Sequence, residues 1–287
     1  MRFPVKFNRS FWRNIPKALP SAADPRILCH GDVDEITFAR AVSTFKFGAT
    51  FKSTQKARFP HSILELSHLE YGAKPIILDV GASDGSTSLD VMRAIPFEKY
   101  YVTDLNIDVF YEISGNATWF FDEKGSCILM VTDKWVVHPD IDDAIFPFNK
   151  ISEALFKRAP KLMDSSTKIF LINPTLLALN DSRISIEKHS IFETWPHEKA
   201  DLIIAANILN RGYFTTSEIT QALRNLAATL NDNGRIAVID NRPGEKASIF
   251  QFSDGKFKLE KRINGGTAIE ALVLAPTTSA SKTHQQV

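Results

Sequence analysis

The chain predicts an α/β fold: a doubly wound, mostly parallel sheet of seven strands with helices on both faces. Short apolar runs alternate with helical patterns from residue 75 onward, one of these runs ends in a glycine-rich turn, and a hairpin signal stands near the carboxyl end. We further expect a helical amino-terminal region, a subdomain inserted after the second strand, and a closing antiparallel hairpin.

The amino-terminal region, residues 1–74, is expected to form a helical arm or cap. Residues 32–71 are mostly helical in pattern, and the phenylalanines within them predict either a lid over a pocket or a helical cap on the core. The first twenty residues hold no acid and five basic residues: Arg2, Lys6, Arg9, Arg13 and Lys17. This pattern predicts either a solvated basic arm or a contact with a membrane surface or partner. A helical arm could also pair two subunits, so a homodimer is possible.

The main domain is expected over residues 75–275. Its first strand is the buried run Ile76–Val80, followed by a helix from Ser86 to Ile95 with Ser86 as its cap. A second strand, Tyr100–Thr103, ends at Asp104. The later predicted elements are strands at Ile184–Lys188, Asp201–Ala205 and Arg235–Ile239, and a helix at Ser217–Leu230. The closing hairpin is expected to join Phe257–Ile263 to Ala268–Leu274 through Asn264-Gly-Gly.

Residues 106–182 are far longer than one crossover between parallel strands requires, and they predict an inserted subdomain. Its predicted strands are Thr118–Phe121, Cys127–Val131, Trp135–Val137 and Ile169–Ile172, with a helix at Ile151–Arg158. Because it follows a strand at the carboxyl edge of the sheet, we expect it to shape the substrate pocket. Its aromatic residues form either the subdomain core or an apolar wall for the substrate. Residues 276–287 have no core-forming side chains and predict a disordered tail.

Composition narrows the classes of function. The net charge of +1 gives no argument for nucleic acid or for an acidic partner. No apolar run is long enough to cross a membrane. The two cysteines, Cys29 and Cys127, have no metal or redox spacing, which predicts a reducing, cytoplasmic location. The seven histidines form no ligand-spaced pair with a carboxylate, so we expect no metal.

The segment from Ile76 to Ser88 predicts a ligand site. A strand that stops at Gly81, turns through Gly85 and enters a helix leaves backbone N–H groups free for a ligand. A carboxylate at Asp79, where the strand closes, repels a pyrophosphate and favours an ammonium group. The segment therefore points to an aminoacyl-bearing ligand rather than a dinucleotide.

With these residues placed, the chain resembles the class I S-adenosylmethionine-dependent methyltransferases over roughly residues 75–275. The family's first motif, an acid followed by x-Gly-x-x-x-Gly, is matched by Asp79-Val-Gly81-Ala-Ser-Asp-Gly85, with Ser83 where a glycine is frequent. The resemblance implies S-adenosylmethionine as the cofactor. It also implies that the closing hairpin supplies the family's antiparallel seventh strand, inserted next to the sixth.

The resemblance also implies roles for single residues. Asp104 is expected to bind the ribose hydroxyls, and Ser190 stands where an acid often contacts the adenine amine. Asn207 would face the methionine end. The full set implied for the cofactor is Asp79, Gly81, Ser83, Asp84, Gly85, Asp104, Leu105, Ser190, Ile191 and Asn207. Asn210 and Tyr213 are the catalytic candidates, and the substrate candidates are Arg211, Trp119 and Trp135.

The expected reaction is in-line methyl transfer to oxygen or nitrogen of a small, partly apolar metabolite, driven mainly by proximity. Nucleic acid is not an expected partner, because no basic residues interleave with aromatic ones. A nicotinamide dehydrogenase is disfavoured, because Gly-x-Gly-x-x-Gly is absent. Two alternatives remain open: a protein carboxyl methyltransferase of the chemotaxis-receptor type, and a non-catalytic module that only binds the cofactor.

Overall fold

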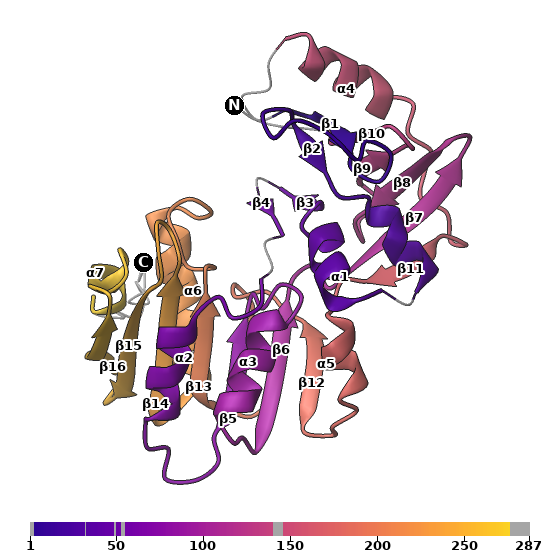
Figure 1. The fold of residues 1–287 in the computed structure, drawn as a ribbon. Helices are drawn as coiled ribbons and strands as arrows, with labels where there is room; N and C mark the ends of the chain where they lie inside the picture. Colours follow the sequence, from indigo (N-terminus) through magenta and orange to yellow (C-terminus); the bar gives the residue numbers. More distant parts are fainter. Residues whose placement is uncertain (1–2, 32, 49, 53–54, 140–145, 276–287) are drawn as a thin grey trace, which may run out of the picture. The chain divides into compact units, whose positions relative to one another are not determined.

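A computed structural model describes residues 3–31, 33–48, 50–52, 55–139 and 146–275. The chain folds into two compact units (Figure 1). Unit 1 consists of Met1–Lys56, Ser83–Ser86 and Asn106–Asn180, and unit 2 consists of Ala57–Ala82, Thr87–Leu105 and Asp181–Val287. Among the described residues, no helix is long and apolar enough to cross a membrane.

Unit 2 contains the predicted α/β sheet. Seven strands lie in the order β12-β6-β5-β13-β14-β15-β16, and the first five run parallel to one another. Their bounds are β5 Ile76–Val80, β6 Lys99–Asp104, β12 Ile184–Lys188, β13 Ala200–Ala206, β14 Leu230–Asp240, β15 Lys246–Ser253 and β16 Lys256–Ile263. This arrangement confirms the prediction of a seven-stranded, mostly parallel sheet in a mixed α/β fold.

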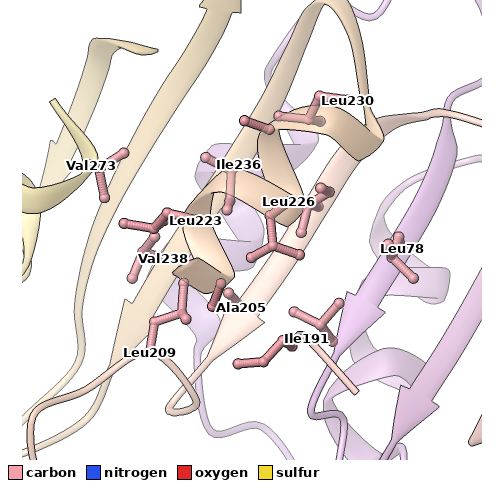
Figure 2. Packing of buried hydrophobic residues seen from close by; sticks show 14 of the residues in the cluster. Leu78, Ile191, Ala205, Leu209, Leu223, Leu226, Leu230, Ile236, Val238 and Val273 are labelled. Carbon is pink, nitrogen blue, oxygen red and sulfur yellow. The ribbon is translucent and has the colours of Figure 1, made fainter. Parts of the chain in front are cut away.

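Helices cover both faces of this sheet. Their bounds are α2 Pro60–Ser67, α3 Ser86–Ala94, α6 Thr216–Thr229 and α7 Glu270–Val273. Figure 2 shows Leu223 and Leu226 of α6 packed over the apolar side chains of the parallel strands. α3 lies over the opposite face, because alternate residues of β5 point to opposite sides and Asp79 of β5 hydrogen-bonds to α3. α6 begins at a capping box in which Thr215 and Glu218 bond each other's backbone N–H groups.

The predicted closing hairpin is wrong in its second strand. β16 lies at the expected Phe257–Ile263, but its hairpin partner is the preceding segment β15, and the tight turn is Asp254-Gly255. Residues 270–273 form α7 instead of a strand. The apolar spacing explains this, because Ile269 and Val273 stand four residues apart and both pack into the core of unit 2.

This end of the sheet also differs from the implied family pattern. β15 is antiparallel to both β14 and β16 and lies between them. The antiparallel strand is therefore the sixth of this sheet along the chain, not the seventh. A simple meander joins β14, β15 and β16, because each connecting loop is short enough for a hairpin.

Unit 1 is built on a second sheet of seven strands in the order β11-β7-β8-β9-β10-β1-β2. Their bounds are β1 Val5–Asn8, β2 Ser21–Ala22, β7 Asp108–Ser114, β8 Ala117–Phe121, β9 Cys127–Val131, β10 Trp135–Val137 and β11 Thr167–Phe170. The short strands β3 Lys46–Phe47 and β4 Thr50–Phe51 form a separate pair. The helices are η1 Pro25–His30, α1 Glu35–Val42, α4 Phe148–Phe156 and α5 Pro174–Ala178. α1 packs in the core on one face of the sheet, and the apolar side of α4 packs on the other.

The start of the amino-terminal region forms strands instead of part of a helical arm, whereas α1 and α2 lie within residues 32–71, where the sequence pattern is helical. Val5–Asn8 forms β1, which pairs antiparallel with β10, and Phe7 and Asn8 then pair with β2. The segment gains its strand hydrogen bonds from residues about 130 positions further along the chain, which local patterning does not reveal. Residues 1–56 thus fold as one unit with most of the inserted segment, whereas residues 57–74 belong to unit 2. The predicted tail, 276–287, lies outside the described residues.

Candidate functional site

The carboxyl ends of four parallel strands bring the main predicted residues of unit 2 to one edge of the sheet. Val80 of β5 pairs with Thr103, and Asp104 pairs with Lys188 of β12. On the other side of β5, Ile204 of β13 pairs with Asp79. Four predicted residues lie at these strand ends or just after them: Gly81, Asp104, Ser190 and Asn207. The chain runs from β5 outward through β6 to β12 and then returns to β13 on the other side of β5. Such a change of direction marks the place where ligands bind in open α/β sheets.

Asp79 is the most unusual group at this edge. The residue is 1% exposed, and its Oδ2 accepts hydrogen bonds from Ser88 Oγ at 2.7 Å and Tyr100 Oη at 3.3 Å. Its Oδ1 is buried and has no hydrogen-bond partner among the described residues. Burial, together with the charge of Asp104, raises the pKa of the Asp79 carboxyl to about 7. A buried acceptor in this state is suited to a cationic N–H donor, since such a donor satisfies Oδ1 and stabilises the ionised form.

The turn after β5 needs unusual backbone conformations. Gly81, Ser83 and Gly85 have φ values of +65°, +60° and +81°. A Cβ at Gly81 would also lie 2.9 Å from Cγ1 of Ile208, so this glycine is required by packing as well as by conformation. Ser83 adopts the left-handed conformation that explains the frequent glycine of the resembling family at this position.

Ser83, Asp84 and Gly85 belong to unit 1, and their neighbours there fix the turn. Lys52 Nζ donates to the carbonyl of Ser83 at 3.0 Å. Asp84 is buried, and its carboxylate accepts from the backbone N–H of Ser86 at 3.0 Å and from the Ser86 hydroxyl at 2.9 Å. Asp84 therefore forms the local side-chain turn that starts α3, which is a structural role.

Asp104 ends β6 beside the exposed side chain of Leu105. Two hydrogen bonds fix this strand end: the Thr103 hydroxyl donates to the carbonyl of Asp79 at 3.0 Å, and Ala82 N–H donates to the carbonyl of Thr103 at 2.9 Å. A half-buried carboxylate next to an exposed apolar side chain offers acceptors for a diol and a surface for a planar ring.

Ser190 and Ile191 follow β12. The Ser190 hydroxyl accepts from the N–H of Phe192 at 3.3 Å and so forms a local turn. Ile191 is 7% exposed and lies in the hydrophobic core with Leu78 and Leu226, as Figure 2 shows. The core position gives Ile191 a packing role.

Asn207 connects the ends of β13 and β14. Its φ is +57°, and its Oδ1 accepts from the N–H of Asn241 at 3.1 Å. Asn210 shapes the next loop, because its Nδ2 donates to the carbonyl of Asn207 at 2.8 Å and its Oδ1 accepts from Gly212 N–H at 2.9 Å. Both polar ends of the Asn210 amide are thus engaged with backbone. Its catalytic role stays a prediction.

Tyr213 lies beside a group of polar residues that the sequence reasoning missed. Arg242 donates through Nη2 to the Tyr213 hydroxyl, and its guanidinium lies 5.1 Å from the centre of the Tyr213 ring. Arg58 Nη2 donates to Asn241 Oδ1 at 3.0 Å. Burial and the nearby charge of Arg242 lower the pKa of Arg58. The predicted substrate residue Arg211 is exposed in the same loop as Asn210.

The two tryptophans predicted to contact substrate belong to unit 1. Trp119 is 7% exposed and packs edge to face with Phe156 of α4, with ring centres 5.8 Å apart. Trp135 is exposed, and the centre of its ring lies 4.9 Å from that of Phe7. Trp119 therefore packs in the core of unit 1. Across the described ranges, no three His, Cys, Asp or Glu side chains gather in a way that could hold a metal ion.

No protein-family model and no curated protein matches this chain. Solved structures do match it. An O-methyltransferase from neocarzinostatin biosynthesis, in complex with S-adenosyl-L-homocysteine and 1,4-dihydroxy-2-naphthoic acid, is 12% identical over 61% of this chain and 34% of its own, with a TM-score of 0.32. An O-methyltransferase family protein from Burkholderia thailandensis is 12% identical over 62% and 36%, with a TM-score of 0.33. The mitomycin 7-O-methyltransferase is 16% identical over 63% and 35%, with a TM-score of 0.33.

The matched part of this chain thus spans about a third of the length of these three proteins. At this level of similarity the function has to be argued from the chain's own residues.

Proposed function

We propose that this chain is an S-adenosylmethionine-dependent methyltransferase whose cofactor lies at the carboxyl edge of the sheet in unit 2. The observation that carries the proposal is the buried Asp79 carboxyl, which has an unpartnered Oδ1 directly before a glycine turn. A ligand with an ammonium group supplies the missing donor. Asp104 stands at the end of the neighbouring strand, where it can accept from ribose hydroxyls.

Each cofactor contact follows from the chemistry of the side chain. Asp79 would bind the ammonium of the methionine part, and Asp104 the ribose. Leu105 would lie against the adenine ring, because its exposed side chain offers an apolar face. Gly81 allows the chain to turn without a side chain that would fill the space. Ser83, Asp84, Gly85 and Ser190 remain predicted cofactor residues, with Ile191 and Asn207 supporting the strand ends.

The reaction would need little from the protein beyond placement. The bound cofactor supplies a methyl group on a sulfonium, and the neutral thioether that departs is a good leaving group. The chain's residues then have to hold the acceptor atom in line with the methyl group and exclude water. Tyr213, which Arg242 contacts, would bind the acceptor, and Arg211 and Arg58 would add positive charge in its surroundings. A base is required only for an acceptor that is still protonated at the reacting atom.

The acceptor is proposed to be a small, partly apolar molecule that is methylated on oxygen or nitrogen. Release of S-adenosylhomocysteine across a panel of phenols, carboxylic acids and amines tests this proposal. We expect product with at least one class of acceptor, and a loss of that product in Tyr213→Phe or Arg242→Gln. A panel without turnover, on a protein that binds the cofactor, would contradict the enzyme assignment.

One observation favours the alternative of a non-catalytic binding module. Asn210, the first catalytic candidate, uses both ends of its amide to hold its own loop. A module would bind S-adenosylmethionine and S-adenosylhomocysteine at the same edge and never release product. The acceptor panel separates the two functions directly.

A further inference from the structure

The loop between β1 and β2 carries an exposed apolar surface that the methyltransferase proposal does not use. The ends of this loop, residues 9–20, are held together, because Phe7 N–H donates to the carbonyl of Pro20 at 2.9 Å and Arg9 N–H donates to the carbonyl of Ala22 at 2.9 Å. Compact surface loops with closed ends are frequently functional. Most residues of the loop are exposed, so its side chains form surface and not core.

Large aromatic side chains gather at this loop. Phe11 is 51% exposed and Trp12 is 38% exposed, and their ring centres lie 5.1 Å apart. The ring centre of Trp12 lies 5.8 Å from that of Phe7 in β1, and the ring of Phe7 in turn contacts the exposed Trp135 of β10. These four rings form one continuous aromatic patch. Contiguous exposed apolar surface marks an interaction site, whereas single exposed apolar residues are ordinary.

The polar atom of the Trp12 side chain is already used inside the protein. Its Nε1 donates to the carbonyl of Lys134 at 3.2 Å. The indole is therefore held in place by a contact within unit 1, and its exposed surface is apolar. Such a surface can enter an apolar environment at little cost, because no unsatisfied N–H group has to leave water.

The charge around the aromatic patch is positive. The loop holds no acidic residue and three exposed basic ones: Arg9, Arg13 and Lys17. The Lys134 ammonium lies 5.6 Å from the centre of the Phe11 ring. The acid next to Lys134 in the sequence, Asp133, forms an ion pair with Arg26 at 2.9 Å. The surface beside the aromatic rings is thus complementary to an anionic partner.

Aromatic and basic side chains on one loop suit an anionic bilayer. Aromatic side chains enter the boundary between lipid headgroups and acyl chains, while nearby lysines and arginines are attracted to anionic headgroups. The ring geometry is unfavourable for single-stranded nucleic acid. Trp12 meets Phe11 and Phe7 edge to face, at 73° and 86°, so these rings do not present parallel faces to successive bases.

We propose that the aromatic patch and the basic loop of unit 1 dock this chain onto the surface of an anionic phospholipid bilayer. Phe11 and Trp12 enter the headgroup boundary, and Arg13 and Lys17 lie among the headgroups. The proposal selects one of the two roles that the sequence leaves open for the basic amino-terminal segment. It is independent of methyl transfer, because all of its residues belong to unit 1 and docking requires no turnover.

Cosedimentation of the full chain with vesicles tests this proposal. One set of vesicles contains only phosphatidylcholine, and the other contains two parts phosphatidylcholine to one part phosphatidylserine. We expect the chain to bind the mixed vesicles, with weaker binding at high salt because ions screen the attraction, and to bind the neutral vesicles little. Tryptophan emission should shift to shorter wavelength on binding. Trp12 and Trp135 report this shift, since Trp119 and Trp195 are buried.

Phe11→Ser should weaken vesicle binding about tenfold or more, because its apolar side chain no longer leaves water. Phe170→Ser is the matched control. Phe170 of β11 is 53% exposed and has the Lys168 ammonium 5.0 Å from its ring centre, but it lies outside the aromatic patch. Arg13→Gln should weaken binding about fivefold through the loss of one charge near the headgroups. Arg158→Gln removes an exposed charge elsewhere in unit 1 and should leave the affinity unchanged.

The Arg13→Gln variant keeps the test valid if Phe11→Ser disturbs the loop. Equal binding to neutral and mixed vesicles, or equal losses in the loop variants and their controls, would overturn the proposal. A chain that binds neither set of vesicles would also overturn it. In that case, binding of oligodeoxythymidine that Phe11→Ser abolishes would assign the patch to nucleic acid, and a dimer that the same variant dissociates would assign it to a second copy of the chain.

Discussion

At the scale of single residues, two residues at the edge of the sheet in unit 2 have opposite effects on the stability of the fold. Asp79 is a buried carboxyl whose environment disfavours its charge, and Gly81 is a glycine whose position excludes any side chain. The burial of the Asp79 carboxyl therefore lowers the stability of the fold when the carboxyl is ionised, whereas Gly81 is needed for packing. These residues give two predictions.

Asp79→Asn should stabilise unit 2 above neutral pH. The folded-state pKa of about 7 lies above the ordinary value of 3.8, so the folded chain binds more protons than the unfolded chain between these values. The free energy of unfolding therefore falls as pH rises from about 4 to 7, by about 4 kcal/mol at about 1.4 kcal/mol per pKa unit. Urea unfolding at pH 5 and pH 8 measures this slope.

The asparagine variant lacks the titrating group, so its slope should be much flatter, and it should bind S-adenosylhomocysteine more weakly. An unchanged pH slope in Asp79→Asn would show that another group causes the dependence.

Gly81→Ala should lower the free energy of unfolding more than the same substitution at a glycine that has free space around its Cβ position. The new Cβ would meet Ile208 at 2.9 Å, on top of the cost of a positive φ. Gly255→Ala is the matched control, because Gly255 has φ of +73° and nothing within 4 Å of its Cβ position. The control should lose about 1 kcal/mol of unfolding free energy, and Gly81→Ala about 1–3 kcal/mol more. Equal losses in chemical denaturation would remove the packing argument.

At the scale of elements, the strands that could be predicted are those whose own residues identify them as buried strands. The buried strand Ile76–Val80 is a continuous apolar run that ends at glycine, and Asp201–Ala205 has the same character. Both lie where they are predicted, within one or two residues. The sequence did not predict β1 and β7, because polar residues interrupt their apolar pattern. These segments become strands through hydrogen bonds to their neighbouring strands.

The carboxyl end shows how two local signals compete. Asn264-Gly-Gly and Asp254-Gly255 both favour a turn, and only the second joins two strands. The residues after Gly266 are held as a helix by Glu270, whose carboxylate accepts from the Ser248 hydroxyl at 2.6 Å and from Arg262 Nε at 2.9 Å. The apolar pair Ile269 and Val273 favours a helix here, and the contacts of Glu270 across the sheet edge add to this preference.

Glu270→Ala should loosen α7 and leave the hairpin intact. The variant loses one hydrogen bond to Ser248 and an ion pair with Arg262, worth about 1–2 kcal/mol together. Hydrogen exchange should therefore speed up at residues 270–273 while the amides of β15 and β16 stay protected. Lys258→Ala is the control, because the ion pair of Lys258 with Asp254 is long, at 3.8 Å, and exposed. A strand in place of α7 would instead give no local change at these residues.

At the scale of the whole molecule, the two units carry buried groups with opposite pH responses. His138 in unit 1 has a pKa lowered to about 4 from 6.5, so unit 1 loses stability as pH falls through this window. Asp79 in unit 2 has a raised pKa, so unit 2 gains stability over much of the same range. Between about pH 4 and 6.5 these two groups therefore change the stability of the two units in opposite directions.

Acidification from pH 7.5 to 5 should lower the opening free energy of unit 1 and raise that of unit 2, each by about 2 kcal/mol. Hydrogen exchange of the backbone amides, corrected for intrinsic rates, measures the opening free energy of unit 1 at β8 and that of unit 2 at β13. His138→Gln should remove most of the response of unit 1 alone. A parallel response of both units would mean that they unfold as one cooperative body.

The candidate site was predictable to a similar extent as the fold. Asp79 and Asp104 stand at the ends of predicted strands, so the strand pattern alone locates them. Arg58, Asn241 and Arg242 come together from segments about 180 residues apart, and no local spacing marks them. Trp119 shows the reverse case, in which an aromatic residue that suggests a binding wall packs in a core.

The central claim is that S-adenosylmethionine binds at the carboxyl edge of the sheet in unit 2 through Asp79 and Asp104. Isothermal titration of S-adenosylhomocysteine into the wild type and into Asp104→Asn tests it most directly. The account predicts binding to the wild type, proton release on binding near pH 7 as Asp79 ionises, and an affinity at least about tenfold lower in Asp104→Asn. No binding to the wild type, or equal affinity in both proteins, would contradict it.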